Sequence, residues 1–189
     1  GGLIARRRNP LKSYSLAKAG LIISSAYLGL TCVHKWYLEG IFDKGLAEQN
    51  IHPTAVMSNP VIFSNFLWCS VARDDSACYI GYYSILQGTS HVKYDRFPKN
   101  EQLGKLISDQ QGYEQLKWFC KDYFIMNRDG DTLNFFDVRY GKSDLGPVTG
   151  SYEHTFVFYF KIKDPSKKPL EIEHYLSEKD MDFSKFMSQ

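Results

Sequence analysis

The chain has 189 residues, of which 43% are hydrophobic and 15% aromatic, and a formal net charge of +2. A chain of this length and apolar content can bury a sizeable core, so a wholly disordered protein is excluded. Apart from Arg6–Arg8 and Lys167–Lys168, charges of both signs are mixed along the chain. No continuous basic surface for nucleic acid is therefore expected.

A long helix over residues 14–47 is the first element that the sequence predicts. It follows residues 1–13, where Gly1–Gly2 resembles a tag remnant and Arg6–Arg8 form a basic flank. Beyond it, residues 48–189 have the composition of one globular domain. The chain therefore divides into a short basic flank, a helix and a domain.

The residues of this helix fit a membrane span. Its strictly apolar run, Ala19–Val33, falls short of the roughly 20 residues of a transmembrane helix. It reaches that length when extended past Lys18 and Lys35, whose side chains can snorkel to the membrane interfaces. Trp36 and Tyr37 suit the aromatic belt, and the positive-inside rule places the basic flank in the cytoplasm and the domain outside it.

An amphipathic helix packed on a soluble core fits the same residues. Apolar or small side chains recur at helical spacing, and polar ones lie off that stripe. The stripe consists of Leu16, Gly20, Ile23, Tyr27, Leu30, Tyr37 and Ile41. The sequence alone leaves both interpretations open.

Residues 48–189 predict an α+β domain. After a connector over residues 50–60, two groups of three strands are expected to form one antiparallel sheet of about six strands, with a helical segment between the groups. The expected strands are residues 61–72, 77–86, 91–97, 122–127, 132–140 and 151–163, and the helical segment is residues 101–120, broken near Gly112. Asp129–Gly130 is a strong hairpin signal in the second group.

The four cysteines form no metal-binding motif. Cys32, Cys69, Cys78 and Cys120 are widely spaced among apolar neighbours, as buried thiols are. Cys69 and Cys78 flank a charged turn, so a disulfide between them is the alternative in an oxidising compartment. The sequence does not decide between free thiols and this disulfide.

No catalytic or metal-binding motif is present, and the five histidines lack the helical spacing of metal ligands. The best polar group for ligand binding is Asp137, Arg139, Glu153 and His154. Asp137 and Arg139 share one face of an expected strand, and the next strand would return Glu153 or His154 beside them. This group would bind an anionic or polar ligand through the forked arginine, or it would be a structural salt bridge.

Five segments in order carry a resemblance to a known family. They are NPVIFSNFLWCSVAR, GYYSIL, LKWFCKDYF, FFDVRYG and EHTFVFYFKI, and the resemblance extends from about Tyr27 to Ile162. In this order they resemble the C-terminal region of the bacterial membrane-bound metal-dependent hydrolases, inner-membrane proteins described as LexA-binding-related. The matching residues are mostly aromatic residues of the packing type.

This resemblance implies several transmembrane helices upstream, with histidine-rich motifs that hold a divalent metal. No such motif stands in this sequence, so the resemblance carries over no catalytic residue and no cofactor. The implied role is a C-terminal extramembrane domain that is inactive alone and presents substrate or binds a partner. The helix over residues 14–47 would then be the last transmembrane segment in a bacterial cytoplasmic membrane, in contact with the upstream segments.

The rival hypothesis is a non-enzymatic domain that binds a lipid, a glycan or a peptide. Its basis is the aromatic content of the expected sheet, which would serve as the binding surface. The sequence does not identify a small-molecule ligand under either hypothesis.

Overall fold

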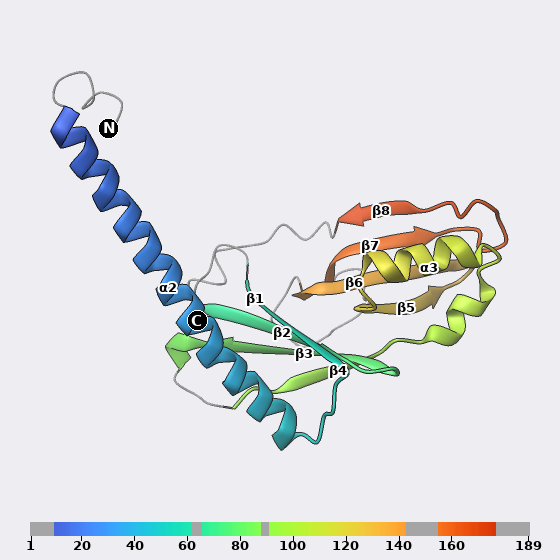
Figure 1. Ribbon diagram of the computed structural model, residues 1–189. Helices are drawn as coiled ribbons and strands as arrows, with labels where there is room; N and C mark the ends of the chain where they lie inside the picture. The colour runs from blue at the N-terminus through green and yellow to red at the C-terminus, as the bar shows by residue number, and fades with distance from the viewer. Residues whose placement is uncertain (1–9, 62–65, 88–90, 143–154, 177–189) are drawn as a thin grey trace. The chain divides into compact units, whose positions relative to one another are not determined.

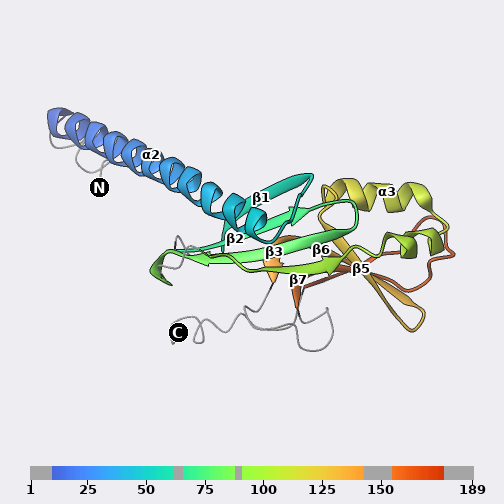
Figure 2. The same cartoon turned by 90° about the horizontal axis from the view of Figure 1, so that it is seen from below.

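The computed structural model describes residues 10–61, 66–87, 91–142 and 155–176. The chain divides into two compact units, Gly1–Asp43 and Lys44–Gln189. Figure 1 shows the helices and strands coloured from blue to red along the chain, and Figure 2 shows the same elements from below. The first unit contains most of one long helix, and the second contains all of the strands.

The long helix α2, Pro10–Glu48, is apolar around its whole circumference in its first part. Leu21, Ile22 and Ile23 are consecutive and are 68%, 59% and 69% exposed. Consecutive residues of an α-helix point about 100° apart, so these three side chains together surround the axis. A one-sided apolar stripe therefore does not describe this segment, and the expected amphipathic pattern is not its main feature.

The second unit is built on two four-stranded antiparallel sheets. The strands of sheet A, in spatial order, are β1 (Ala55–Pro60), β2 (Leu67–Arg73), β3 (Ala77–Ser84) and β4 (Tyr94–Pro98). Those of sheet B are β5 (Phe124–Asp129), β6 (Thr132–Lys142), β7 (Phe156–Ile162) and β8 (Glu173–Leu176). Between the sheets in sequence come the 3-10 helices η1 (Ile85–Gln87) and η2 (Glu101–Leu106) and the helix α3 (Gln110–Phe119).

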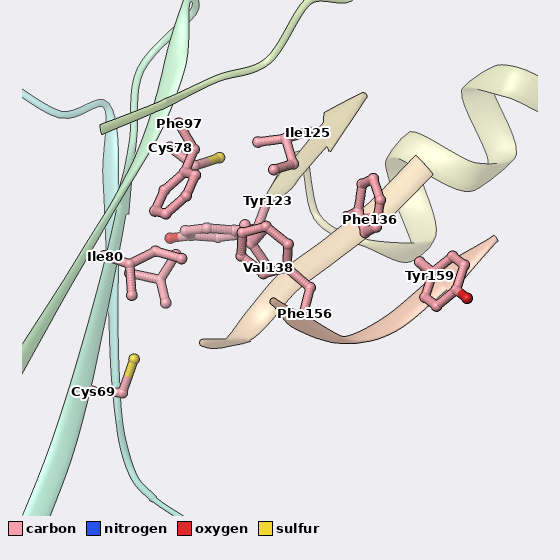
Figure 3. Packing of buried hydrophobic residues seen from close by; sticks show 11 residues of the cluster. Cys69, Cys78, Ile80, Phe97, Tyr123, Ile125, Phe136, Val138, Phe156 and Tyr159 are labelled. Carbon is pink, nitrogen blue, oxygen red and sulfur yellow. The ribbon is translucent and has the colours of Figure 1, made fainter. Parts of the chain in front are cut away.

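The main core lies between the two sheets. Sheet A contributes Cys69, Val71, Cys78, Ile80 and Phe97, and sheet B with the residue before it contributes Tyr123, Ile125, Phe136, Val138, Phe156 and Tyr159. Figure 3 shows these side chains facing one another across the gap between the sheets. Because neighbouring strands follow one another in sequence order and are antiparallel, each sheet is a meander.

A second core lies on the opposite face of sheet B, beneath η2 and α3. Phe124 and Phe135 stack there with ring centroids 4.7 Å apart, and Tyr113 of α3 meets both rings edge-on. Leu116 and Ile162 are buried in the same cluster. Sheet B is therefore covered on two faces, which explains why the residues of β6 from Leu133 to Val138 are all buried.

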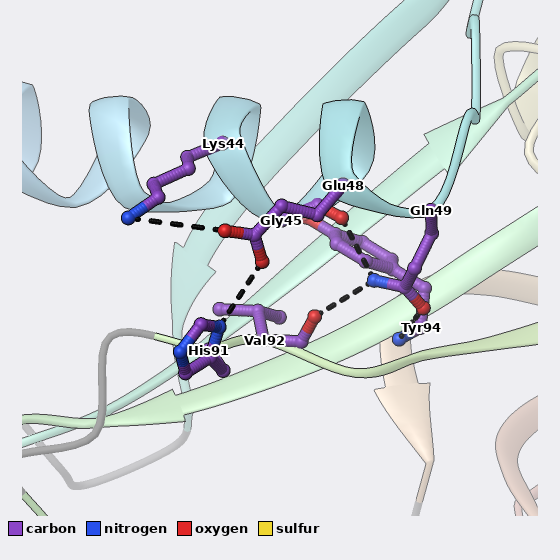
Figure 4. A network of polar contacts seen from close by, with 7 residues as sticks. All are labelled: Lys44, Gly45, Glu48, Gln49, His91, Val92 and Tyr94. Carbon is purple, nitrogen blue, oxygen red and sulfur yellow. Dashed lines mark hydrogen bonds and ion pairs between the residues drawn. The ribbon is translucent and has the colours of Figure 1, made fainter.

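The end of α2 that belongs to the second unit is fixed to β4 by one glutamine. The Gln49 side-chain amide donates to the carbonyl oxygens of Gly45 and Val92, each at 2.8 Å, and its oxygen accepts from the Tyr94 amide at 3.0 Å. Figure 4 shows this network beside the contact between the Glu48 carboxylate and the His91 ring, whose Oε2 and Nδ1 atoms are 3.1 Å apart. The side-chain amide of Gln49 thus makes hydrogen bonds with the backbone of Val92 and Tyr94, at the start of β4, as a neighbouring strand would.

The structure differs from the expected single sheet of about six strands. Each half gains one strand: β1 forms within the expected connector and β8 within the charged segment after Asp164. The expected helical segment divides at residues 107–109, because Asp109 caps α3 and accepts from the Gly112 amide at 3.1 Å. Gly112 therefore lies inside a helix rather than at a break. Residues 62–65 and 151–154 of two expected strands lie outside the described residues.

Two turns hold the hairpins that the sequence predicted. Gly130 has a φ of +57° and follows Asp129, which pairs with Thr132 across a two-residue loop. In the other turn, the Asp74 carboxylate accepts hydrogen bonds from the amides of Ser76 and Ala77 and from the hydroxyls of Ser76 and Tyr79. Burial opposes ionisation of Asp74, but these hydrogen bonds outweigh it and lower its pKa from 3.8 to about 2.

Asp74→Ala is expected to lower the free energy of unfolding at pH 7 by about 1–2 kcal/mol, a value reduced for partial solvent screening. Because the folded-state pKa lies below the unfolded value of 3.8, this contribution is fully present above that value. It disappears as the pH falls through about 2. Urea denaturation of wild type and variant across this range measures it, with exposed Asp75→Ala as the control. An equal difference at pH 7 and at pH 2 would contradict the assignment.

Gly141 allows the end of β6 to approach sheet A. Its φ is +72°, and a Cβ there would lie 2.5 Å from the Tyr82 hydroxyl and 2.8 Å from the Cys69 sulfur. At Gly130, by contrast, φ is also positive but a Cβ would meet nothing within 4 Å. The two glycines share the backbone requirement and differ in the space around them.

Gly141→Ala is therefore expected to cost about 2–4 kcal/mol of stability, from backbone strain and overpacking together. Gly130→Ala is expected to cost about 1 kcal/mol, from backbone strain alone. Thermal or urea unfolding of the two variants under one condition gives the comparison. Equal losses would show that the close approach to Tyr82 and Cys69 does not matter.

Candidate functional site

Asp137 and Arg139 form a paired group on β6. The Arg139 Nε lies 3.0 Å and 3.1 Å from the two carboxylate oxygens, and Nη2 lies 2.6 Å from Oδ2. The Arg139 amide also donates to Oδ1 at 3.1 Å. Both side chains lie on the face of sheet B that carries α3, as their period-two spacing predicted.

The Asp137–Arg139 ion pair is largely buried. The Asp137 side chain is 2% exposed and that of Arg139 is 14% exposed. Hydrogen bonding to Asp137 raises the pKa of Arg139, so the guanidinium stays charged. Burial first, and then the Asp137 charge, raise the pKa of the nearby Cys120 thiol, which is fully buried. Cys120 is therefore a neutral neighbour and not an activated nucleophile.

Aromatic rings surround the arginine and continue across sheet B. The guanidinium carbon lies 5.2 Å from the Phe119 ring centroid and 5.7 Å from that of Tyr140. Further ring contacts, at centroid distances of 4.8–6.1 Å, connect Tyr140 to Phe158, Phe158 and Phe160 to His174, and Phe119 to Phe160. We call this surface the aromatic face: Phe119, Tyr140, Phe158, Phe160 and His174.

Much of the aromatic face is open to solvent. Tyr140 is 55% exposed and Phe119 53%. Large aromatic side chains gathered on one exposed face are typical of binding surfaces. The aromatic face adjoins the buried Asp137–Arg139 pair, so a rigid polar anchor lies at its base.

The four predicted ligand-binding residues are thus described only in part. Asp137 and Arg139 lie together, whereas Glu153 and His154 lie outside the described residues. The prediction did not include Phe119, Tyr140, Phe158 or His174 in the site. The signal for Phe158 was present in the strict alternation of its strand, but no local pattern shows that Phe119 ends α3 beside that strand.

The three cysteines of the second unit are free and buried. The predicted alternative of a Cys69–Cys78 disulfide is wrong because the strand register places Tyr82 opposite Cys69 and Arg73 opposite Cys78. Figure 3 shows the two sulfurs at separate places on sheet A. Burial raises the pKa of each thiol to about 12, against the opposing effects of nearby groups.

A second buried polar group joins the sheets near Cys69. The Lys142 amide donates to the Tyr82 hydroxyl at 2.5 Å, and the Lys142 ammonium lies 2.8 Å from an Asp95 carboxylate oxygen. The Lys142 side chain is only 4% exposed. These contacts tie β6 to β3 and β4, so their evident role is to fix the sheets together.

Among the described residues, no group of three or more His, Cys, Asp or Glu side chains could hold a metal ion. The residues present in that part of the chain therefore do not fit a divalent metal. No step that depends on a metal can be assigned to them.

Comparison with models of known protein families, with curated proteins and with solved structures gave no match. The site must therefore be interpreted from its own geometry.

Arg139→Met is expected to lower the free energy of unfolding by about 3–5 kcal/mol, because it leaves the Asp137 carboxylate buried without its partner. Replacing both residues by apolar ones, in Asp137→Leu/Arg139→Met, is expected to restore most of this loss. Urea denaturation of the single and double variants measures the difference. A double variant less stable than the single one would contradict this account of the pair.

Proposed function

We propose that α2 anchors this protein in the bacterial cytoplasmic membrane and that residues 48–189 form an extracytoplasmic domain. The observation that carries the proposal is the apolar circumference of α2. In the described residues, one helix, Tyr14–Glu48, is long and apolar enough to cross a membrane, and its most apolar window has no buried residue. A membrane anchor and a signal sequence both have these properties.

The length of the apolar segment favours an anchor. Tyr14 and Tyr37 delimit it, and the rise of 1.5 Å per residue makes it about 35 Å long. This length matches a hydrocarbon core of about 30 Å with aromatic residues at both interfaces. The strictly apolar run within it, Ala19–Val33, also has the length of the apolar core of a signal sequence, about 7–15 residues, so it is the full segment between the two tyrosines that supports an anchor. Ser24 and Thr31 donate to carbonyl oxygens three residues earlier, so their hydroxyls need no water inside the membrane.

The charges on both sides of the segment support the orientation. Arg6–Arg8 precede it, and Glu39, Asp43 and Glu48 follow it, with Lys35 and Lys44 as i,i+4 partners of two of these acids. Because basic residues remain on the cytoplasmic side, the arginines support a cytoplasmic N-terminal flank and an extracytoplasmic domain.

The resemblance to the bacterial membrane-bound metal-dependent hydrolases supports a role for the domain within a larger protein. Under this proposal, the hydrolase's catalytic histidines and divalent metal belong to upstream transmembrane segments. The domain is non-catalytic and presents substrate or binds a partner, and α2 is the last spanning helix. Translation of the coding sequence upstream of residue 3 tests this. Apolar segments with paired histidines are expected, and their absence would refute the hydrolase assignment while leaving the anchor untouched.

Cys32 provides a direct test of the anchor, because it is the exposed cysteine and Cys69, Cys78 and Cys120 are buried. In intact membranes, a membrane-impermeant maleimide is expected to leave Cys32 unlabelled, since the thiol lies in the hydrocarbon region. After denaturation in sodium dodecyl sulfate, which removes both the bilayer and the tertiary structure, labelling at Cys32 is expected. Cys32→Ser is the control for labelling elsewhere. Full labelling in intact membranes would contradict a span.

A second candidate function is the non-enzymatic binding of a lipid, glycan or peptide, and the aromatic face is the observation that favours it. If this face binds a ligand, Tyr140→Ala should abolish a ligand-dependent rise in melting temperature while changing the unliganded value little, because this side chain is largely exposed. A thermal-shift screen with lipids, sugars and peptides finds the ligand. Exposed Leu86→Ala is the matched control, and an equal ligand response in the two variants would exclude the aromatic face.

A further inference from the structure

Two exposed apolar side chains lie at one end of the hairpin formed by β2 and β3. The strand register pairs Leu67 with Ser84, and the Ile85 amide donates to the Phe66 carbonyl oxygen at 2.9 Å. These contacts bring Phe66 and Leu86 to the open end of the hairpin, where they are 56% and 78% exposed. We call Phe66 and Leu86 the apolar tip.

The charges of the hairpin lie at its other end. Between Glu48 and Lys93 the sequence has only three acidic or basic residues, and all three lie at the β2–β3 turn: Arg73, Asp74 and Asp75. At about 3.4 Å per residue, the length of β2 separates this turn from the apolar tip by about 20 Å. The hairpin is therefore charged at one end and apolar at the other, as expected for a segment that meets a lipid surface end-on.

The part of α2 that belongs to the second unit runs alongside the approach to β4. Gln49 makes hydrogen bonds with the backbone of Val92 and Tyr94, and a Cβ at Gly45 would lie 3.0 Å from the Val92 Cβ (Figure 4). The path back along α2 from Gln49 to Gly45 thus follows the chain back from Tyr94 to Val92. Because β3 is antiparallel to β4 and pairs Gly81 with Tyr94, the same direction leads along β3 toward the apolar tip.

The lengths of these elements agree with a lipid surface at the apolar tip. Tyr37, which marks one interface of the proposed span, precedes Gly45 by eight residues of the same helix, a distance of about 12 Å along the axis. From Gly81, opposite the first residue of β4, β3 continues by three residues to Ser84, a distance of about 10 Å. The apolar tip therefore extends past the attachment of α2 by about the distance that separates this attachment from the bilayer surface.

We propose that Phe66 and Leu86 insert into the lipid bilayer that α2 spans, at the depth of the headgroups and the upper acyl chains. This inference rests on the proposed function, because the anchor brings the domain to the bilayer. Two apolar side chains alone bind a bilayer only weakly. Since α2 already holds the domain at the membrane, their insertion is in effect intramolecular and takes place at a high effective concentration of lipid. The contact fixes the orientation of the domain on the membrane.

Fluorescence quenching in phosphatidylcholine vesicles tests the proposal. The full chain with Cys32→Ser and Leu86→Cys is labelled with an NBD fluorophore at the new thiol, because the three remaining cysteines are buried. Replacing part of the lipid by phosphatidylcholine with a nitroxide on its upper acyl chain is expected to remove at least half of the emission. The same label in Asp75→Cys, at the charged turn, is the matched control and is expected to keep its emission.

A second pair of variants tests whether the apolar side chains make the contact. Adding Phe66→Ser to the chain labelled at Leu86→Cys is expected to reduce the quenching, because half of the apolar tip is lost. The control is Val56→Ser, which removes an exposed apolar side chain of β1 that pairs with Ala72 near the charged turn. Equal quenching in these two variants would overturn the assignment of Phe66 and Leu86.

A label on Cys32, in the chain without substitutions, distinguishes failure of the apolar tip from failure of the anchor. Cys32 lies five residues from Tyr37, about 8 Å along the helix, so the same nitroxide is expected to quench it. Quenching at Cys32 with none at Leu86→Cys would overturn the apolar tip and leave the anchor standing. Quenching at Leu86→Cys with none at Cys32 would support the lipid contact of the tip and refute the anchor. Emission unchanged at both positions would overturn both proposals.

Discussion

The burial of sheet B on both of its faces is the constraint on which the rest of the second unit depends. The side chains of β6 alternate between the two cores, so Phe136 and Val138 pack toward sheet A while Leu133 and Phe135 pack beneath α3. A strand in this position can place no polar side chain freely, because each face is closed to water. Asp137 is tolerated because Arg139 occupies both of its oxygens, and the buried Asn134 side chain donates to that of Asn127. The aromatic face begins where this coverage ends.

The predicted and the observed structures agree where a local signal decides the outcome. Asp129–Gly130 fixes a hairpin by its own backbone preference, and the apolar run after Ala77 forms a strand. The alternation around Phe158 did find a sheet strand. The register of Asp137 and Arg139 likewise follows from the period of two in a strand, and so the sequence placed them on one face.

Other features depend on contacts between distant segments and leave no local pattern. β1 contains Pro60 and was expected as a connector, but it is an edge strand, where a proline is tolerated. The sequence predicted one sheet and the structure has two. A series of antiparallel hairpins has the same sequence pattern whether the next strand continues one sheet or begins another. In the candidate site, Phe119 joins Arg139 only because α3 ends above β6 and β7, which is a property of the packing and not of its sequence neighbours.

The three buried thiols have a consequence for how the protein is placed in a cell. The domain contains no covalent cross-link between its described strands, and the Cys69, Cys78 and Cys120 sulfurs are shielded inside packed cores. The described strands are therefore held together without the disulfides that an oxidising compartment favours. The proposed side of the membrane rests on the charges that flank the helix.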